Sequence, residues 1–516
     1  MAREKDEVYT NQSILDMCKG VGKLGDKRDP RGLRHLMHEI LTLIIMGFLY
    51  GCNSYRAIHR KFHPEDPVKQ ESMLAQLRTF LELPYGVPHF STLSRTIAQL
   101  DPDVLVTMVA ELIASLLPEQ QQGDRYHICI DGKAIRAAMN KNITGNSLYI
   151  VNVVIAGYYL FTNQILVGPK KQEGKVIEEN IALLLNGMQG TCTLDAMGTK
   201  KKLLGLILDS GCDAVLPVKS NNEKLRKGIC EFIRNNVDDC PALVEYYADL
   251  NGYSEDKDAP AKVIRNTRCK VFDEDNHNTE DATEDVARPV ETLPLFDDFY
   301  SYSALDSAPE LDSANAQLCY VKVGDRLMKM VSSHGRLERR EFELITDPDT
   351  IEAILTKNDC FGGWNRIVAL GQVTRYRGEK IRDPETKKQV WNISITRTPY
   401  ISTHCTDVRE FAATIRSHWN VETWHGQALD KRMSEDKCTT RSGNAPENLS
   451  CLRKLVSDMA VVEVARDRLA EGAPPIKPGQ DGNSLLEGFT EFFESIGNNF
   501  KAIRKMITQR IRSPYK

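Results

Sequence analysis

Hydrophobic positions recur at helical spacing through residues 1–125. In "LRHLMHEILTLIIMGFLYG" (33–51) they follow the three-to-four-residue period of a helix, and Gly51 can end it. The stretch "STLSRTIAQL" predicts a further short helix that opens at the capping-type residue Ser91. Such short helices are typical of a helix-turn-helix DNA-binding module and equally of any small helical bundle. Their basic residues are Arg56, Arg60, Lys61 and Arg95.

The period changes at residue 126. In "YHICIDG" the residues Tyr126, Ile128 and Ile130 share one face, as in a half-buried strand. Two further β-rich runs follow, "SLYIVNVVIAGYYLF" and "NQILVGP". Next come a helical pattern, "VIEENIALLLNGM", a strand, "GTCTLDAMG", a helix, "KKLLGLILDSG", and a strand, "AVLPVK". The order β-β-β-α-β-α-β predicts a mixed α/β sheet.

The second half of the chain alternates between strand and helix patterns. Strands are expected in "HGRLERREFELI", "WNRIVALGQVTRYR" and "QVWNISITRT", within residues 316–404. A long amphipathic helix is expected at about 407–433, and "EGAPPIKPGQDGN" (471–483) is typical of a linker. The tail is expected to end in a basic helix with Lys501, Arg504, Lys505, Arg510 and Arg512.

Charge changes this picture only when its distribution is considered. The 516 residues carry a net charge of −4, which does not favour a nucleic-acid binder. Between Asp238 and Asp312, however, 20 Asp and Glu face 6 Lys and Arg, so the rest of the chain is mildly basic. The acidic block, 238–312, is typical of a flexible or loosely folded insertion.

The lengths of the apolar runs and the spacing of the cysteines indicate the cellular compartment to expect. The longest apolar run, 40–50, is too short for a membrane span, which needs about 20 residues. No basic and apolar leader opens the chain, so no secretion signal is expected. The 13 cysteines form no CxxC pair, which argues against a zinc ribbon and favours buried thiols in a reducing cytosol.

Two aspartates stand at the ends of predicted strands. Asp131 and Asp195 each close a β-like run and have a glycine within three residues. Ligand sites of α/β sheets gather at strand ends, although strand-terminal Asp is also a common turn or capping residue.

A third acid lies on the long helix. At about 100° per residue, Glu422 falls within about 20° of Ile415, inside the stripe that also holds Phe411 and Trp419. A buried carboxylate needs a metal ion, a cationic partner or a proton. A salt bridge with Arg416 or His418 is the structural alternative to a functional role. Two strand-end aspartates and an inward glutamate suit paired Mg²⁺ or Mn²⁺ ions, which activate a hydroxyl and stabilise a leaving 3′-oxygen.

These residues resemble the motifs of a known family. The segments "IDGKAIR", "LDAMGTKK", "AVLPVKSNN", "HGRLERR", "RSHWNVE" and "SGNAPENLSCLRKL" are similar, in this order, to motifs of the ISAs1-type, H-repeat-associated DDE transposases. The segments "DPRGLRHLMHEILTLIIMGFLYGCNSYRAI" and "PHFSTLSRTIAQLDPD" resemble the helical domain that precedes their catalytic core. The resemblance covers roughly residues 25–460.

The resemblance implies an α/β fold with a ribonuclease H-like mixed sheet, a helical N-terminal domain and a mostly β insertion. In that fold the first and fourth strands are neighbours, which would bring Asp131 and Asp195 together, and the long helix would add Glu422. The domains implied are 1–125 (helical, candidate DNA-binding), 126–225 (first part of the core), 226–405 (insertion with the acidic block), 406–460 (catalytic helix and end of the core) and 461–516 (linker and basic tail).

The implied activity is DNA transposition at the ends of an insertion sequence. Two Mg²⁺ or Mn²⁺ ions held by Asp131, Asp195 and Glu422 would support strand cleavage and attack of the freed 3′-hydroxyl on target DNA. Synapsis of two ends implies a homodimer, and the expected location is the cytoplasm, at the nucleoid when DNA is bound. DNA contacts are expected from Lys133, Arg136, Lys200, Lys219, Asn221, Arg416, His418 and Trp419.

Several positions depart from the family pattern. Thr423 stands where Asn is usual, and Gly426 and Gln427 stand where His and Trp are expected. Lys175 takes the place of an acid near the core, and Ser220 replaces a glycine. Two alternatives therefore remain: a domesticated, catalytically weakened DNA-binding protein, and a metal-dependent phosphohydrolase of small molecules.

Overall fold

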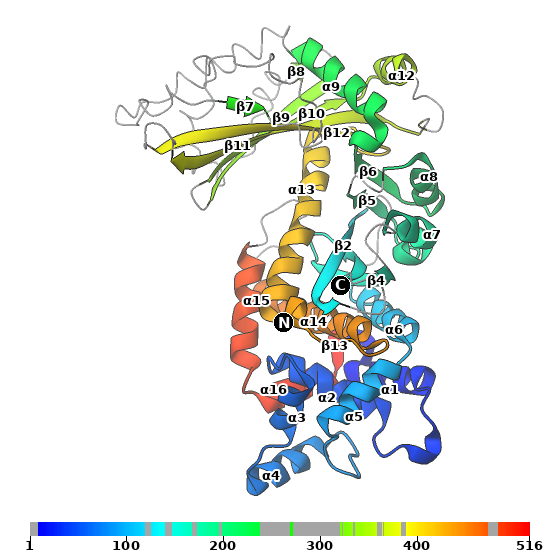
Figure 1. Cartoon of the computed structure of the whole chain (residues 1–516), viewed down its shortest axis with the longest axis vertical. Helices are drawn as coiled ribbons and strands as arrows, with labels where there is room; N and C mark the ends of the chain where they lie inside the picture. The colour runs from blue at the N-terminus through cyan, green and yellow to red at the C-terminus, as the bar shows by residue number, and fades with distance from the viewer. Residues whose placement is uncertain are drawn as a thin grey trace, which may run out of the picture. The chain divides into compact units, whose positions relative to one another are not determined.

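A computed structural model defines the fold (Figure 1). It describes residues 9–118, 125–139, 147–167, 173–195, 199–237, 269–271, 320–321, 324–333, 336–358, 364, 366–382, 389–472 and 483–515. The chain divides into two compact units. The first comprises Met1–Thr193, Asp209–Cys212 and Arg416–Lys516, and the second comprises Leu194–Leu208 and Asp213–Ile415.

The first unit begins with helices, as the periodicity predicted. They are α1 (Ile14–Gly25), α2 (Met37–Leu49), α3 (Tyr55–Phe62), α4 (Pro67–Leu77), α5 (Phe90–Gln99) and α6 (Pro102–Ala114). Twelve of the thirteen residues of α2 are buried, which explains why its sequence is apolar on nearly every side. The prediction that Ser91 caps α5 is wrong, because the helix begins one residue earlier and His89 is its N-cap.

The sheet of the first unit follows the predicted order of strands. The strands β2 (Tyr126–Met139), β3 (Ser147–Ile155), β4 (Leu160–Val167) and β5 (Gly190–Leu194) are arranged β4-β3-β2-β5. The pairs β2/β3 and β3/β4 are antiparallel. The helix α7 (Glu173–Leu185) precedes β5. In the sheet, β5 lies beside β2, so the first and fourth strands of the segment are neighbours.

Two C-terminal elements complete the first unit. The long helix α14 (Ala445–Ala470) is buried over most of its length and packs against α2, α5, α6 and β4. Its Asn448 amide donates to the carbonyls of Ile97 and Leu100, at the end of α5. The helices α15 (Asn483–Ile496) and α16 (Phe500–Thr508) follow, and β13 (Arg510–Arg512) pairs with β1 (Tyr9–Ser13).

The second unit is rich in strands, as predicted for the insertion. Its sheet runs β6 (Asp213–Pro217), β12 (Gln389–Ser402), β11 (Ala369–Arg382), β10 (Arg336–Ile345), β9 (Gly324–Ser333) and β8 (Tyr320–Val321), with β7 (Cys269–Val271) paired to β12. The helices α8 (Lys201–Asp209), α9 (Glu223–Val237) and α12 (Pro348–Lys357) accompany it. Apart from β7, the acidic block at 238–312 lies outside the described residues.

The predicted long helix is observed as α13 (Val408–Trp424), followed by a π-helical segment, His425–Arg432. Phe411 and Ile415 belong to the second unit, where they pack with Phe342 and Val373 in the apolar core. From Arg416 onward, the helix belongs to the first unit. In the described part of the chain, no helix combines the length and apolar character that crossing a bilayer requires.

Candidate active site

Asp131 lies in the middle of β2, opposite Asn152 of β3. The prediction that it closes the strand is wrong, because β2 continues to Met139. Its side chain is only 20% exposed. Burial alone would raise the pKa of this carboxyl, but a hydrogen bond and charge from His425, together with the charge of His418, outweigh burial and lower the pKa of Asp131. The carboxylate is therefore ionised at neutral pH.

The partner of Asp131 is His425, at the start of the π-helical segment. Its Nδ1 atom lies 3.3 Å from Oδ2 of Asp131, and its Nε2 atom lies 3.4 Å from the amide nitrogen of Asn152. The imidazole also stacks on Phe161, with ring centroids 5.6 Å apart and planes inclined by 9°. Three contacts thus fix the ring, and π-helical turns of this kind are frequent at functional sites.

A second histidine of α13 contacts the end of β5. The Nδ1 atom of His418 lies 3.0 Å from the hydroxyl of Thr193, two residues before Asp195 in sequence. The neighbouring strands β2 and β5 are therefore each contacted by a histidine, His425 of the π-helical segment and His418 of α13.

Glu422 lies between these two histidines along the helix. At about 100° per residue, Glu422 and His425 fall within about 40° of His418, so the three side chains share one face. Glu422 is exposed. The prediction that it is buried in the apolar stripe is wrong, because Phe411 and Ile415 pack in the core of the second unit and that buried face does not continue to residue 422.

Sequence analysis missed two residues beside Asp131. His425 stands three residues after Glu422, one position before the place where the family pattern led us to look for a histidine. Glu173, the first residue of α7, is 6% exposed, and its Oε1 atom would lie 2.2 Å from a Cβ atom added to Gly132. Glu173 supplies a buried acid near the core, whereas Lys175, at the aligned position, is exposed and pairs with Glu179.

Lys133 does not fit the DNA contact predicted for it. Its ammonium lies 2.6 Å from Asp430, 2.9 Å from Glu435 and 3.4 Å from Asp436, and its side chain is 9% exposed. An ammonium enclosed by three carboxylates is satisfied inside the protein. The prediction for Lys133 is therefore corrected: this lysine belongs to a buried ionic cluster that ties β2 to the segment after α13.

The cluster extends to α14. Burial would raise the pKa of Glu435, but Lys133, Lys454 and Arg453 lower it to about 2. Burial lowers the pKa of Lys454 to about 8, and its ammonium donates to Gln164 and to Ser450. Since Ser450 also donates to Glu435, the ionic groups of three segments are connected.

The other predicted DNA contacts in the first unit differ in accessibility. The side chain of Arg136, on β2, is 82% exposed, with Nε 3.5 Å from Asp436. Arg416 is partly buried, and His418 contacts Thr193 as described above. The side chain of Trp419 and that of Thr423 lie outside the described residues.

Asp195 belongs to the second unit, where it follows β5 directly. Its side chain is 56% exposed, and its Oδ1 atom lies 3.5 Å from the ammonium of Lys219. Asn221 donates its amide to the carbonyl of Thr199 at 3.1 Å and so holds the turn before α8. Lys200 is exposed in the same turn.

The predicted metal ligands offer suitable donor chemistry. Asp131 is ionised, and Asp195 and Glu422 present exposed carboxylates, which are the oxygen ligands that Mg²⁺ prefers. Within the described ranges, no three His, Cys, Asp or Glu side chains are grouped so that they could hold a metal ion. Metal binding by the three acids stays a prediction.

Comparison with known proteins identifies the class. The family model described as DDE_Tnp_1-associated matches residues 19–113, which span α2 to α5. "Putative transposase YncI" of Escherichia coli O157:H7 is 22% identical over 448 residues, covering 87% of each chain. "H repeat-associated putative transposase YhhI" of Escherichia coli (strain K12) is 22% identical over 450 residues, covering 86% of this chain and 89% of the relative.

A solved structure, the piggyBac transposase synaptic complex with hairpin DNA, aligns with 96% of this chain and 79% of its own chain, at 11% identity and a TM-score of 0.33. Both sequence relatives are named as putative transposases. The chain is thus similar over most of its length to H-repeat-associated putative transposases, which is the resemblance that the motifs in its sequence indicated.

Proposed function

We propose that the protein is a DNA transposase of insertion-sequence type that cleaves strands at element ends and joins the freed 3′-hydroxyl to target DNA. Asp131, Asp195 and Glu422 are its catalytic acids. The single observation that carries the proposal is the position of Glu422 near the end of α13. Along the chain it lies between His418, which contacts Thr193 of β5, and His425, which begins the π-helical segment and contacts Asp131. A helix that reaches both strands is suited to deliver its carboxylate to them.

The strand order supports a ribonuclease H-like core. Across the sheet of the first unit the strands are arranged β4-β3-β2-β5. The first strand of this segment, β2, therefore lies beside its fourth strand, β5. Each of the two aspartates is attached to one of these neighbouring strands: Asp131 is in β2, and Asp195 is the residue after β5. Two-metal phosphodiester chemistry would require these acids to approach one another when the ions bind.

Two Mg²⁺ ions, or Mn²⁺ ions, bound by the three acids would activate the attacking oxygen and stabilise the leaving 3′-oxygen. The protein's own contribution is to keep Asp131 ionised and oriented, which the contact with His425 supports. Lys219 neutralises part of the charge near Asp195, and exposed Arg136 and Lys200 are available for backbone phosphates. Two copies of the chain would hold the two element ends.

One observation favours the alternative of a DNA-binding protein with weakened catalysis. His425 already occupies one oxygen of Asp131, so a metal ion would compete with an imidazole for that carboxylate. The two functions differ in cleavage but share DNA affinity.

Nicking of supercoiled plasmid in Mg²⁺ tests the proposal. We expect the variants Asp131→Asn, Asp195→Asn and Glu422→Gln each to lose strand cleavage while binding DNA as the wild type does, because a carboxamide keeps the shape and removes the charge. Glu471→Gln, at an exposed acid after α14, is the matched control and should cut normally. Undiminished cutting by any of the three variants would exclude the assigned triad, and DNA binding without cutting by the wild type would establish the alternative.

A further inference from the structure

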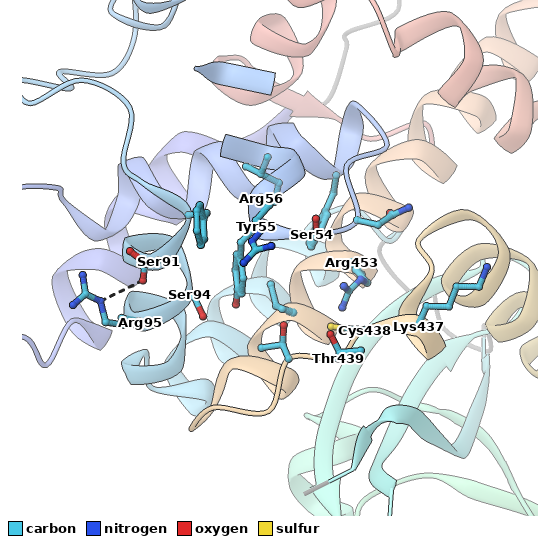
Figure 2. Close-up of a pocket in the computed structure, with 16 residues that line it drawn as sticks. Ser54, Tyr55, Arg56, Ser91, Ser94, Arg95, Lys437, Cys438, Thr439 and Arg453 are labelled. Atoms are coloured by element: carbon cyan, nitrogen blue, oxygen red, sulfur yellow. Dashed lines mark hydrogen bonds between the residues drawn. The ribbon is translucent and has the colours of Figure 1, made fainter. Parts of the chain in front are cut away.

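A second site lies in the first unit, between helices that match the transposase-associated family model and a later part of the chain, residues 437–453. A pocket of about 550 Å³ is bounded by α3, α5, the 3₁₀ turn at Glu435–Lys437 with the segment after it, and α14 (Figure 2). All of these elements belong to one compact unit. None of the three proposed catalytic acids lines this pocket.

The base of the pocket holds a buried cation. Arg453 of α14 is 1% exposed, and its guanidinium lies 5.0 Å from the centroid of the Phe48 ring. Its Nε and Nη1 atoms are buried and have no hydrogen-bond partner among the described residues. A buried guanidinium with unused donors is costly unless a ligand pairs with it, so these donors point to an anion.

The charged residues that line the pocket are all basic. The lining contains four Lys and Arg residues and neither Asp nor Glu. Three of the four are exposed, namely Arg56, Arg95 and Lys437, and the fourth, Arg453, is buried. Figure 2 shows Arg56 and Arg453 nearer the centre of the pocket than Arg95, which donates to the carbonyl of Ser91, and Lys437. The N-terminus of α3, with Ser54 and Tyr55, also lines the pocket, and its helix dipole adds positive potential.

The thiol of Cys438 reports this potential. Cys438 is buried, and burial favours the neutral thiol. The charge of Arg453, with hydrogen bonds from Arg453 and Thr440, outweighs burial and lowers the pKa of Cys438. The pocket therefore stabilises negative charge even in a weak acid such as a thiol.

An aromatic ring accompanies the cations. The guanidinium of Arg56 lies 5.1 Å from the centroid of the Phe90 ring, and both residues line the pocket. Arginines that fork onto phosphate oxygens, next to aromatic faces on which bases can stack, are the groups that recognise nucleotides in unpaired or distorted strands.

We propose that this pocket binds a nucleotide phosphate, with Arg453 as its buried anchor and Arg56 and Arg95 at its entrance. The nucleotide is part of a DNA strand, so the pocket is a DNA contact additional to the catalytic site; this assignment of the source rests on the proposed function. A free nucleotide offers the same phosphate chemistry, and the experiment separates the two sources.

The first arm of the experiment tests the phosphate alone. We expect inorganic phosphate, against chloride at equal ionic strength, to raise the Tm of the full-length wild-type chain more than that of Arg453→Lys, since lysine keeps the charge but loses the fork. General stabilisation by phosphate is common to both proteins. Equal increases in Tm for the two would overturn the site. If Arg453→Lys does not fold, Arg56→Ala replaces it in the same comparison.

The second arm tests the DNA source, by fluorescence anisotropy with a labelled DNA duplex carrying a single-stranded end. We expect Arg56→Ala to weaken binding about tenfold and to reduce the salt slope by about 1, as loss of a phosphate contact does. Arg60→Ala, one turn further along α3 and outside the pocket, is the matched control and should change affinity less than about twofold.

The outcomes are distinguishable. DNA would be overturned as the source by two results together. The variants Arg56→Ala and Arg60→Ala would bind the labelled DNA equally well, and a free deoxynucleoside monophosphate would raise the Tm of the wild type in place of inorganic phosphate. Wild-type protein that binds no DNA would end the proposed function, yet the Tm comparison would still decide whether the pocket takes phosphate.

Discussion

The Nδ1 atom of His425 lies 3.3 Å from the Oδ2 atom of Asp131, and this contact joins the start of the π-helical segment to the centre of β2. The same imidazole stacks on Phe161, so its position is fixed from two sides. A residue that sequence analysis missed therefore contacts this carboxylate and contributes to lowering the pKa of Asp131.

Replacing His425 by Phe should raise the pKa of Asp131. The ring stacking on Phe161 would remain, but the hydrogen bond and the charge that lower the pKa would be lost, leaving burial, which raises it. We therefore expect the pKa of Asp131 to shift upward in His425→Phe. Titration of the carboxyl carbon by NMR, with Asp131→Asn to assign the signal, measures it.

The control for this variant is His404→Phe, in the second unit, which should leave the titration of Asp131 unchanged. Since the folded-state pKa of Asp131 is lowered, its contribution to stability is present above the unfolded pKa and is lost as pH falls through the folded value. Identical titration curves for wild type and His425→Phe would contradict the assigned contact.

Gly132→Ala should destabilise the first unit. An added Cβ atom would lie 2.2 Å from Oε1 of Glu173 and 2.4 Å from Cε1 of Tyr149, closer than non-bonded atoms approach. We expect a loss of about 1–3 kcal/mol in the free energy of unfolding, as for other overpacked sites. Urea unfolding measures it.

Gly205→Ala is the matched control, because nothing lies within 4 Å of the Cβ position in α8. There the substitution should be neutral or stabilising by up to about 1 kcal/mol, the helix propensity difference. Equal effects of the two substitutions would show that the packing around Gly132 is looser than described.

Most of the fold of the core could be predicted because its signals are local. The alternation in β2, the β-branched run of β3 and the helical period of α7 lie within short segments, and each gave the correct element. The insertion was correctly expected to be strand-rich for the same reason, while the nature of its acidic block stays a prediction.

The environment of single side chains could not be predicted in this way. Lys133 stands next to Gly132 in a motif typical of a catalytic core, yet its three carboxylate partners come about three hundred residues later. The burial of Glu422 was wrongly predicted from one helical stripe. The helix α13 passes from the second unit to the first at Arg416, and a different face of the helix is buried in each unit. Such pairings depend on tertiary contacts that periodicity does not contain.

Lys133→Met should destabilise the protein far more than Arg136→Met. Removing the ammonium leaves Asp430, Glu435 and Asp436 facing one another, and the loss expected for breaking a buried ionic cluster is about 3 kcal/mol. Arg136 is exposed, and its substitution should change stability by less than about 0.5 kcal/mol. Chemical denaturation of both variants makes the comparison; similar stabilities would place Lys133 outside a stabilising cluster.

Glu435→Gln should show a loss of stability that depends on pH. The folded pKa of Glu435 is about 2, against an ordinary value of 4.5, because Lys133, Lys454 and Arg453 outweigh burial. A lowered carboxyl pKa contributes stability above the unfolded value, and this contribution disappears as pH falls from about 4.5 toward 2. We therefore expect Glu435→Gln to lose on the order of 3 kcal/mol at pH 7 and less than half of that at about pH 3. Urea unfolding at the two pH values, with the exposed Glu65→Gln as control, measures the difference. A loss that is the same at both pH values would mean that Glu435 acts through packing and its hydrogen bond to Ser450 rather than through its charge.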